Sequence, residues 1–324
     1  MELITTQEFP SIYRGDFVKM FPADDACVAF LEKLRCPNGF VCPACGEQRT
    51  PWRQTRKRLV CPRCRNQCTV TAGTIFDKTR TPLTTWFDAA WHVTTMKNGM
   101  SAKTLERMMG VSYRVAWDML HRFRVAMVRV AREPLSGQVE VDETMIGGVE
   151  KGGKRGRGTA KGIVVIAVEI KHPKGYGRIR MRHVPDASAD SLEPFVREMV
   201  AKGSVVCTDG WRSYNGLSNG YEHRQTILSS LGDPAHVAMP GVHQIASLLK
   251  RWLLGTHQGS LTMEHLQSYL EEFTFRFNRR TSHSRGQLFR RLLEQAVSTH
   301  PVTEADILHG YQWNPEANKL EELT

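Results

Sequence analysis

The chain has 324 residues, which is enough for two or three domains with sizeable cores. Its formal net charge of +11 favours a polyanionic partner, of which nucleic acid is the commonest, over a basic soluble enzyme. No apolar run reaches the roughly 18 residues of a membrane-spanning helix, and the first residues lack the pattern of a signal peptide. We therefore expect a cytoplasmic protein with no membrane partner, in which the eight cysteines bind metal or stay reduced.

A cysteine-rich segment, residues 36–75, follows a short helical lead-in over residues 1–35. It contains two pairs, CPAC and CPRC, with 15 residues between them, which is the spacing of a four-cysteine zinc site. Each pair presents two thiolates to one tetrahedral ion, so the shell would be closed and the Zn²⁺ structural. The alternative is four reduced, unliganded thiols. The predicted zinc ligands are Cys42, Cys45, Cys61 and Cys64.

Basic residues surround these cysteines, with Trp52 among them. They can form a face that contacts phosphates and stacks one aromatic ring on DNA. A solvated hairpin that only keeps the ribbon soluble is the alternative. The positions predicted to contact DNA here are Arg53, Arg56, Lys57 and Arg58.

Residues 76–132 are predicted to be helical. Pro82 suits the first turn of one helix, Ser101 caps a second that Gly110 ends, and Ser112 caps a third. Two helices joined by a short glycine-containing turn form a helix-turn-helix, whose last helix can enter a major groove. An ordinary helical hairpin has the same pattern. The last helix is expected to bury Val115, Ala116, Met119, Leu120 and Phe123, and to place Tyr113, Arg114, Trp117, Asp118, His121 and Arg122 on or beside its other face; Tyr113, Arg114 and Arg122 are predicted to contact DNA.

Residues 133–295 alternate strand-like and helical patterns, which predicts an α/β domain, and residues 296–324 form a C-terminal extension. Strands are predicted at residues 138–144, 163–168, 177–183 and 205–210, and helices at residues 188–201 and from about 242 to 254. Three strands, a helix, a fourth strand and a helix are the order of a ribonuclease H-like fold. In that fold the first and fourth strands are neighbours.

Asp142 lies inside the first predicted strand and Asp209 at the end of the fourth. Neighbouring strands would bring the two carboxylates together, and carboxylate oxygens are the ligands that Mg²⁺ prefers. Two divalent ions about 4 Å apart can activate a nucleophile and stabilise a leaving oxygen in phosphoryl transfer. Taken singly, either residue is as readily a turn or cap residue.

Four segments of the sequence resemble a known family. They are CPACG with CPRC, VEVDETMIGG, CTDGWRSY, and HQIASLLKRWLLGTHQG followed by HLQSYLEEFTFRFNRR. These motifs are similar to those of bacterial insertion-sequence transposases of the DDE superfamily, in the subgroup with a zinc ribbon and an Asp-Asp-His/Asn-Lys active site. The resemblance implies a transposase that binds the terminal inverted repeats of its element, cleaves the ends and joins the freed 3′-hydroxyl to target DNA. It also implies a dimer or higher oligomer on double-stranded DNA, associated with the bacterial nucleoid.

By the same resemblance, Asp142 and Asp209 match the first two catalytic aspartates, which would hold two Mg²⁺ or Mn²⁺ ions. The third position of the superfamily, usually Glu, falls on His243, and the lysine that follows it is Lys250. Imidazole is a poorer ligand for Mg²⁺ than a carboxylate, so His243 is either a third metal ligand or a base that positions the attacking hydroxyl.

Glu140 and Glu143 are the rival sources of a third carboxylate. Glu143 is one residue from Asp142 and points to the opposite face of the strand, whereas Glu140 is two residues away and shares its face. Glu140 is therefore the stronger rival to His243.

Further cations are expected near the DNA. Lys250 lies two helical turns after His243, where it can neutralise a phosphate near the scissile bond, unless it is only a solvated cation. Three arginines of FRFNRR hold DNA or brace the catalytic helix, and a glycine-rich loop after the first strand is basic. The DNA-binding predictions in these segments are Arg276, Arg279 and Arg280, and Lys154, Arg155 and Arg157.

Two other functions stay open on the sequence. The missing Glu favours a catalytically inactive, sequence-specific DNA-binding protein derived from a transposase. The predicted strand order alone would also permit a ribonuclease H-like nuclease that acts on hybrids or junctions.

Overall fold

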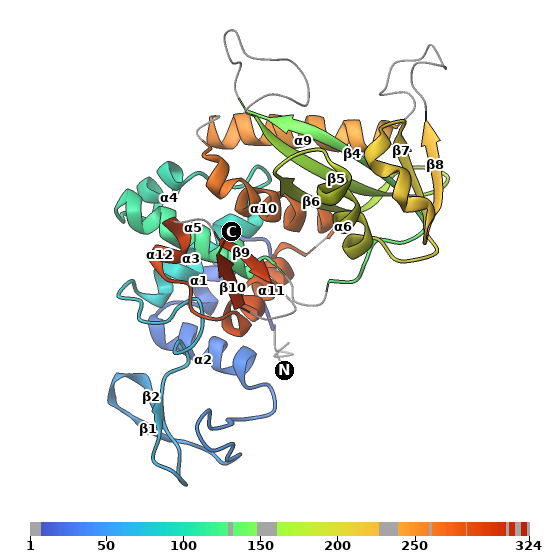
Figure 1. Cartoon of the computed structure of the whole chain (residues 1–324). Helices are drawn as coiled ribbons and strands as arrows, with labels where there is room; N and C mark the ends of the chain where they lie inside the picture. The colour runs from blue at the N-terminus through green and yellow to red at the C-terminus, as the bar shows by residue number, and fades with distance from the viewer. Residues whose placement is uncertain are drawn as a thin grey trace. The chain divides into compact units, whose positions relative to one another are not determined.

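The computed structural model describes residues 8–128, 132–147, 161–226, 239–258, 261–282 and 284–308, and the backbone of residues 311–314 and 319–322 (Figure 1). The chain divides into two compact units. The first comprises Met1–Val130 and Thr281–Thr324, and the second comprises Ala131–Arg280. In the described part of the chain, no helix is long and apolar enough to cross a membrane.

The first unit is mostly helical. Its helices are α1 (Arg14–Met20), α2 (Asp24–Arg35), α3 (Leu83–Thr95), α4 (Ala102–Met109), α5 (Tyr113–Ala126), α11 (Arg285–Ser298) and α12 (Glu304–Leu308). A small antiparallel sheet contains β1 (Trp52–Gln54), β2 (Arg58–Val60) and β3 (Gln67–Cys68), with η1 (Thr55–Lys57) between β1 and β2. The strands β9 (Tyr311–Asn314) and β10 (Lys319–Glu322) form an antiparallel pair.

An aromatic cluster holds α1, α2, α3 and α11 together. The ring of Phe289, on α11, lies 5.6 Å from the rings of Phe17 and Phe21 and 5.7 Å from that of Phe87. Phe289 is fully buried. This packing places α11 in the first unit, whereas the sequence analysis set the end of the catalytic domain at residue 295. The pattern of an amphipathic helix predicts that one face is buried, but it does not predict which unit packs against that face.

The predicted caps of α4 and α5 are confirmed. The Ser101 hydroxyl accepts a hydrogen bond from the backbone N–H of Thr104, and that of Ser112 accepts one from Val115. Gly110 ends α4 with a φ of +65°, a left-handed conformation that glycine adopts without strain.

The expected exposure of His121 on α5 is wrong, because this side chain is fully buried. The helices α3, α4, α11 and α12 all contact α5, so its C-terminal half is covered on several sides. The sequence pattern predicted burial on one face only.

The second unit is built on a five-stranded mixed sheet. Its strands are β4 (Gln138–Ile146), β5 (Gly162–Ile170), β6 (Tyr176–Val184), β7 (Val205–Asp209) and β8 (Glu222–Thr226), in the order β6-β5-β4-β7-β8. The pairs β4–β5 and β5–β6 are antiparallel, and β4–β7 and β7–β8 are parallel. The four predicted strands are present, and β8 is an additional, mostly polar edge strand.

Helices cover both faces of this sheet. The helix α6 (Ala189–Met199) and the short helix η2 (Arg212–Ser218) cover one face, whose core contains Val139, Val141, Phe195 and Val206. The helices α9 (Pro240–His257) and α10 (Leu266–Asn278), with η3 (Met263–His265) before α10, cover the other (Figure 1). Burial on both faces explains why seven consecutive residues of β5, from Gly162 to Val168, are buried.

Candidate functional site

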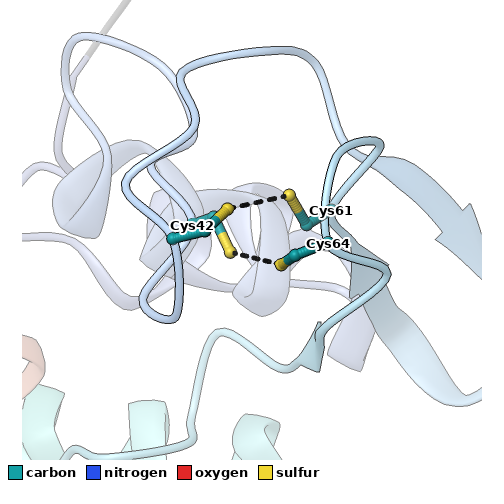
Figure 2. Close-up of side chains that lie close together, drawn as sticks. Cys42, Cys61 and Cys64 are labelled. Atoms are coloured by element: carbon teal, nitrogen blue, oxygen red, sulfur yellow. Dashed lines mark hydrogen bonds between the residues drawn. The ribbon is translucent and has the colours of Figure 1, made fainter.

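The four predicted zinc ligands converge in the first unit (Figure 2). The Sγ atoms of Cys42 and Cys64 are 3.6 Å apart, those of Cys45 and Cys61 are 3.7 Å apart, and all four lie within 4.8 Å of one another. This spacing and four soft donors fit one tetrahedral Zn²⁺. In the described ranges, this is the one set of three or more such side chains close enough to hold an ion.

The two CxxC turns share one backbone geometry. The N–H of Gly46 donates to the carbonyl of Cys42, and the N–H of Arg65 donates to that of Cys61, so each turn closes four residues after its first cysteine. Gly46 and Arg65 both have positive φ, +72° and +63°. Burial raises the pKa of the Cys42 thiol and backbone N–H groups of Ala44 and Cys45 act to lower it, whereas hydrogen bonds with the neighbouring thiols raise that of Cys45. The four thiols therefore share protons as one group.

Most of the predicted basic DNA contacts near the ribbon are paired within the first unit. Arg53 donates to both carboxylate oxygens of Glu32, at 2.7 and 3.0 Å, and the Lys57 ammonium lies 3.1 Å from Asp25. Arg58 donates to the side-chain oxygen of Gln67, and Arg56 lies exposed in η1. These exposed pairs are weak, so they leave the side chains available to phosphates.

Trp52 presents an aromatic surface on the same small sheet. Its side chain is about half exposed, and the guanidinium of Arg65 lies 4.1 Å from its ring centroid. The pair places a cation and an aromatic face together on this sheet.

On α5 the three predicted DNA contacts differ in their surroundings. Tyr113 and Arg114 are exposed at the first turn, and Arg114 pairs with Glu304 of α12. Arg122 is mostly buried, lies 2.9 Å from Asp118 and donates to the carbonyl of Ile75. Its guanidinium is therefore used in packing the first unit, unlike the exposed position that the sequence pattern suggested.

Asp142 and Asp209 lie on the same face of neighbouring parallel strands. The pairs of β4 and β7 end at Glu140↔Cys207, and each aspartate is two residues further along its strand. An advance of two residues keeps both side chains on one face and at one level. The fold order predicted that these strands are neighbours, and they are: the two aspartates occupy corresponding positions beyond the paired residues.

Hydrogen bonds fix both carboxylates. Oδ1 of Asp142 accepts from the backbone N–H of Glu143 at 2.8 Å, and Oδ1 of Asp209 accepts from that of Trp211 at 3.0 Å. The indole N–H of Trp211 donates to the carbonyl of Ala187, which anchors the turn after Asp209.

Tyr214, which the sequence analysis did not single out, lies beneath these carboxylates. Its buried hydroxyl donates to Oε2 of Glu143 at 3.0 Å. Burial raises the pKa of Tyr214 well above its usual value, and the charges of Glu143, Asp142 and Asp209 raise it further. The Tyr214 hydroxyl therefore holds Glu143 on the face of β4 opposite to Asp142. Its position in CTDGWRSY, five residues after Asp209, was the available signal.

Glu140, the rival third carboxylate, is committed to α9. It is 5% exposed, and its Oε2 accepts from the backbone N–H of Val242 at 3.0 Å. Burial raises the pKa of Glu140, although the N–H groups of Val242 and Gly241 act to lower it. Glu140 lies on the face of β4 that α9 covers, whereas Glu143 contacts Tyr214 in the core of the opposite face.

His243 and Lys250 lie on one flank of α9. The helix packs on the sheet through Val242, Ile245, Ala246, Leu249 and Leu253. On its other flank Trp252 contacts Phe273 of α10, with ring centroids 5.6 Å apart, and α10 packs on β6. At 100° per residue, His243 and Lys250 lie on the side of α9 opposite to Trp252, and so away from α10.

Lys250 and Lys161 place positive charge at the flank of α9 that bears Lys250. Burial lowers the pKa of the Lys250 ammonium, and the charge of Lys161, just before β5, lowers it further. Two cations near an acidic site suit a substrate with several phosphates. Among the described residues, the ligand atoms of Asp142, Asp209 and His243 are not close enough together to form a group that could hold a metal ion.

The arginines of FRFNRR brace the second unit. Arg276 donates to the buried carboxylate of Glu272 at 2.8 Å, and Arg280 donates to the carbonyls of Gly177 and Tyr176 on β6. The guanidiniums of Arg279 and Arg280 lie 4.0 and 3.8 Å from the rings of Phe275 and Phe277. These contacts hold α10 and β6 together and do not reach α9, so neither bracing of the catalytic helix nor DNA binding is tested by them. The predicted contacts Lys154, Arg155 and Arg157 lie outside the described residues.

Comparison with known proteins identifies both units. Residues 134–278 match the ISXO2-like transposase domain and residues 22–67 match the transposase zinc-ribbon domain, which together span more than half of the chain. An uncharacterized protein in the transposable element ISH50 of Halobacterium salinarum is 28% identical over 283 residues, covering 80% of this chain and 92% of that protein. An uncharacterized transposase-like protein of Haemophilus influenzae is 29% identical over 115 residues, covering 35% of this chain and 92% of that protein. With a ribbon of four converging thiols and two aspartates on adjoining strands, the chain belongs to the insertion-sequence transposases of the DDE type.

Proposed function

We propose that this chain is a DNA transposase that binds the terminal inverted repeats of its insertion sequence, cleaves the element ends and transfers them into target DNA. The observation that carries the proposal is the position of Asp142 and Asp209 two residues beyond the last paired residues of β4 and β7. Family membership supports the same reading.

We assign the second unit a ribonuclease H-like fold. The support is the sheet order β6-β5-β4-β7-β8, in which the first and fourth strands of the unit, β4 and β7, are neighbours and parallel. In the proposed site, Asp142 is joined by Asp209 at the end of β7 and by His243 and Lys250 on α9.

The carboxylates of Asp142 and Asp209 fit hard divalent cations, Mg²⁺ or Mn²⁺, which when bound in a pair activate a nucleophile and stabilise a leaving oxygen. The protein supplies orientation: backbone N–H groups of Glu143 and Trp211 each fix one oxygen of an aspartate. Lys250 neutralises charge on the scissile phosphate. His243 completes the site as a ligand or as the group that orients the attacking hydroxyl.

The first unit supplies DNA recognition. The helices α4 and α5, joined by the turn at Gly110, act as a helix-turn-helix, with Tyr113 and Arg114 exposed at the start of α5. The zinc ribbon adds a second contact through Trp52 and its basic residues. Two element ends must be held at once, so the protein acts as a dimer or higher oligomer on DNA.

The test is strand transfer of pre-cut element ends into a plasmid, with Mg²⁺ or Mn²⁺. Joined products that disappear in Asp142→Asn are expected. Absence of joining with either metal, despite specific binding of the repeats, would favour a DNA-binding protein without catalysis. Cleavage of RNA–DNA hybrids or four-way junctions in place of element ends would favour a nuclease.

A further inference from the structure

We propose that Glu140 is a positioning residue that anchors the first turn of α9 to β4, and that it is not a ligand of the catalytic metal. Its consequence for catalysis rests on the proposed function, because α9 carries His243 and Lys250. The anchoring itself is a property of the fold and can be tested without any activity.

The carboxylate of Glu140 is hydrogen-bonded to the first turn of α9. Glu140, the third residue of β4, is 5% exposed, and its Oε2 accepts from the N–H of Val242 at 3.0 Å. The first four N–H groups of a helix have no partner within the helix, and their partial positive charge attracts an anion. Glu140 therefore caps α9 from a strand 102 positions away in the sequence.

The backbone of α9 also lies close to the sheet at Gly241. A Cβ atom added at Gly241 would lie 2.8 Å from Oε2 of Glu140 and 2.7 Å from Cδ1 of Ile170. A side chain at position 241 would therefore require Ile170 or Glu140 to shift. Glycine at 241 and glutamate at 140 thus form one close contact.

The position of Glu140 on β4 favours anchoring of α9 over ligation of the catalytic metal. Glu140 and Asp142 share a face of β4 but lie about 7 Å apart along the strand. Oε2 of Glu140 is held by the backbone of α9 one residue before His243. A shift of that backbone would move His243 directly, and Lys250 with it, because both belong to the same rigid helix.

Two substitutions distinguish positioning from ligation. Glu140→Gln keeps an oxygen that can accept from Val242 but removes the charge that a metal ligand needs. Glu140→Leu removes the acceptor. The matched control is Glu169→Leu, which removes a largely buried carboxylate on β5 that accepts instead from the N–H groups of Ser136 and Arg178.

Hydrogen exchange and strand transfer are measured on each full-length variant. We expect Glu140→Gln to transfer strands within about threefold of the parent and Glu140→Leu to lose at least about tenfold, as is usual when a supporting contact of a metal site is removed. Exchange should accelerate in the first turn of α9 in Glu140→Leu and not in Glu169→Leu.

Several outcomes would overturn the proposal. One is a Glu140→Gln variant as inactive as Asp142→Asn, which would make Glu140 a ligand. Another is unchanged exchange of α9 in Glu140→Leu. If Glu140→Leu does not fold, Gly241→Ala decides: it keeps the carboxylate but obstructs the contact, so faster exchange in α9 supports anchoring and parental exchange refutes it. If the parent itself transfers no strands, the transposase proposal fails, while the exchange data still decide the anchoring.

Discussion

Asp142 and Asp209 each lie two residues beyond the last paired positions of β4 and β7, so the parallel register holds their carboxylates on one face. Neither residue could be moved by one position without turning its side chain to the core packed by α6. The register therefore sets the positions of the two aspartates, and the turn at Trp211 donates a hydrogen bond to Asp209.

Replacing either aspartate should remove catalysis and leave DNA binding intact. Asp142→Asn and Asp209→Asn keep the shape of the side chain but remove an anionic ligand, so strand transfer should fall by more than about 100-fold. Transfer and binding of the inverted repeat are measured on the same preparations. Asp190→Asn, an exposed acidic residue at the start of α6, is the control. Equal loss in that variant would point to net charge and not to the site.

The sequence predicted the strands of the second unit because their residues have clear patterns. β5 is a continuous apolar run, as in strands buried on both faces, and β4 alternates apolar and polar residues, which is the period of a strand. It predicted the zinc ligands because the spacing of two CxxC pairs fixes their geometry.

Other features depend on contacts that no local pattern encodes. Glu140 meets Val242, and Phe289 meets Phe17, only once distant segments have packed. The burial of His121 likewise depends on several helices that surround α5. For the same reason β8, whose residues are mostly polar, was not predicted: it exists because β7 offers it hydrogen bonds.

His243 should be replaceable by Glu. A ligand role predicts that His243→Glu retains strand transfer within about tenfold and shifts the preference from Mn²⁺ towards Mg²⁺, because carboxylate oxygens suit Mg²⁺ better than imidazole does. His243→Ala should be inactive. Transfer is measured across a titration of each metal, with Gln244→Glu as the control on the neighbouring exposed position of α9. A folded but inactive His243→Glu would instead indicate that His243 acts as a base.

Lys250 should support transfer only while it is charged. Burial and Lys161 lower its pKa, so the ammonium loses its proton at a lower pH than an ordinary lysine. Activity should be full below that lowered pKa and decline as the pH rises through it. Lys250→Ala should lose about 10- to 100-fold, the worth of one charge-assisted hydrogen bond.

Replacing Lys250 with arginine tests whether the decline of activity at high pH comes from loss of the Lys250 proton. Lys250→Arg stays protonated throughout the range, so its pH profile should lack the decline on the alkaline side. Rates are measured from pH 6 to pH 10, with the exposed Lys202→Ala as the control. A parental decline that persists in Lys250→Arg would assign it to another group.

Cys42→Ser should release the structural metal. Hydroxyl oxygen is a poor zinc ligand, and three remaining thiolates leave the tetrahedral shell open. Zinc measured by atomic absorption should fall from one ion per chain to well below one, and specific binding of the inverted repeat should weaken. Cys36→Ser is the matched control, because Cys36 is outside the set of four converging thiols. Unchanged zinc content in Cys42→Ser would contradict the assignment of ligands.

Arg114 should contribute to DNA binding from the first turn of α5. Its side chain is 73% exposed, and its partner Glu304 lies in an exposed pair that a phosphate or base can displace. Arg114→Ala should weaken binding of the inverted repeat by about 1–3 kcal/mol if the guanidinium reads a base, with a loss of specificity at that position. If it contacts a phosphate, affinity should fall for all sequences and the slope of log affinity against log salt should decrease by about 1. Lys19→Ala, an exposed cation on α1, is the control for net charge. Equal effects of the two substitutions would remove α5 from the recognition surface.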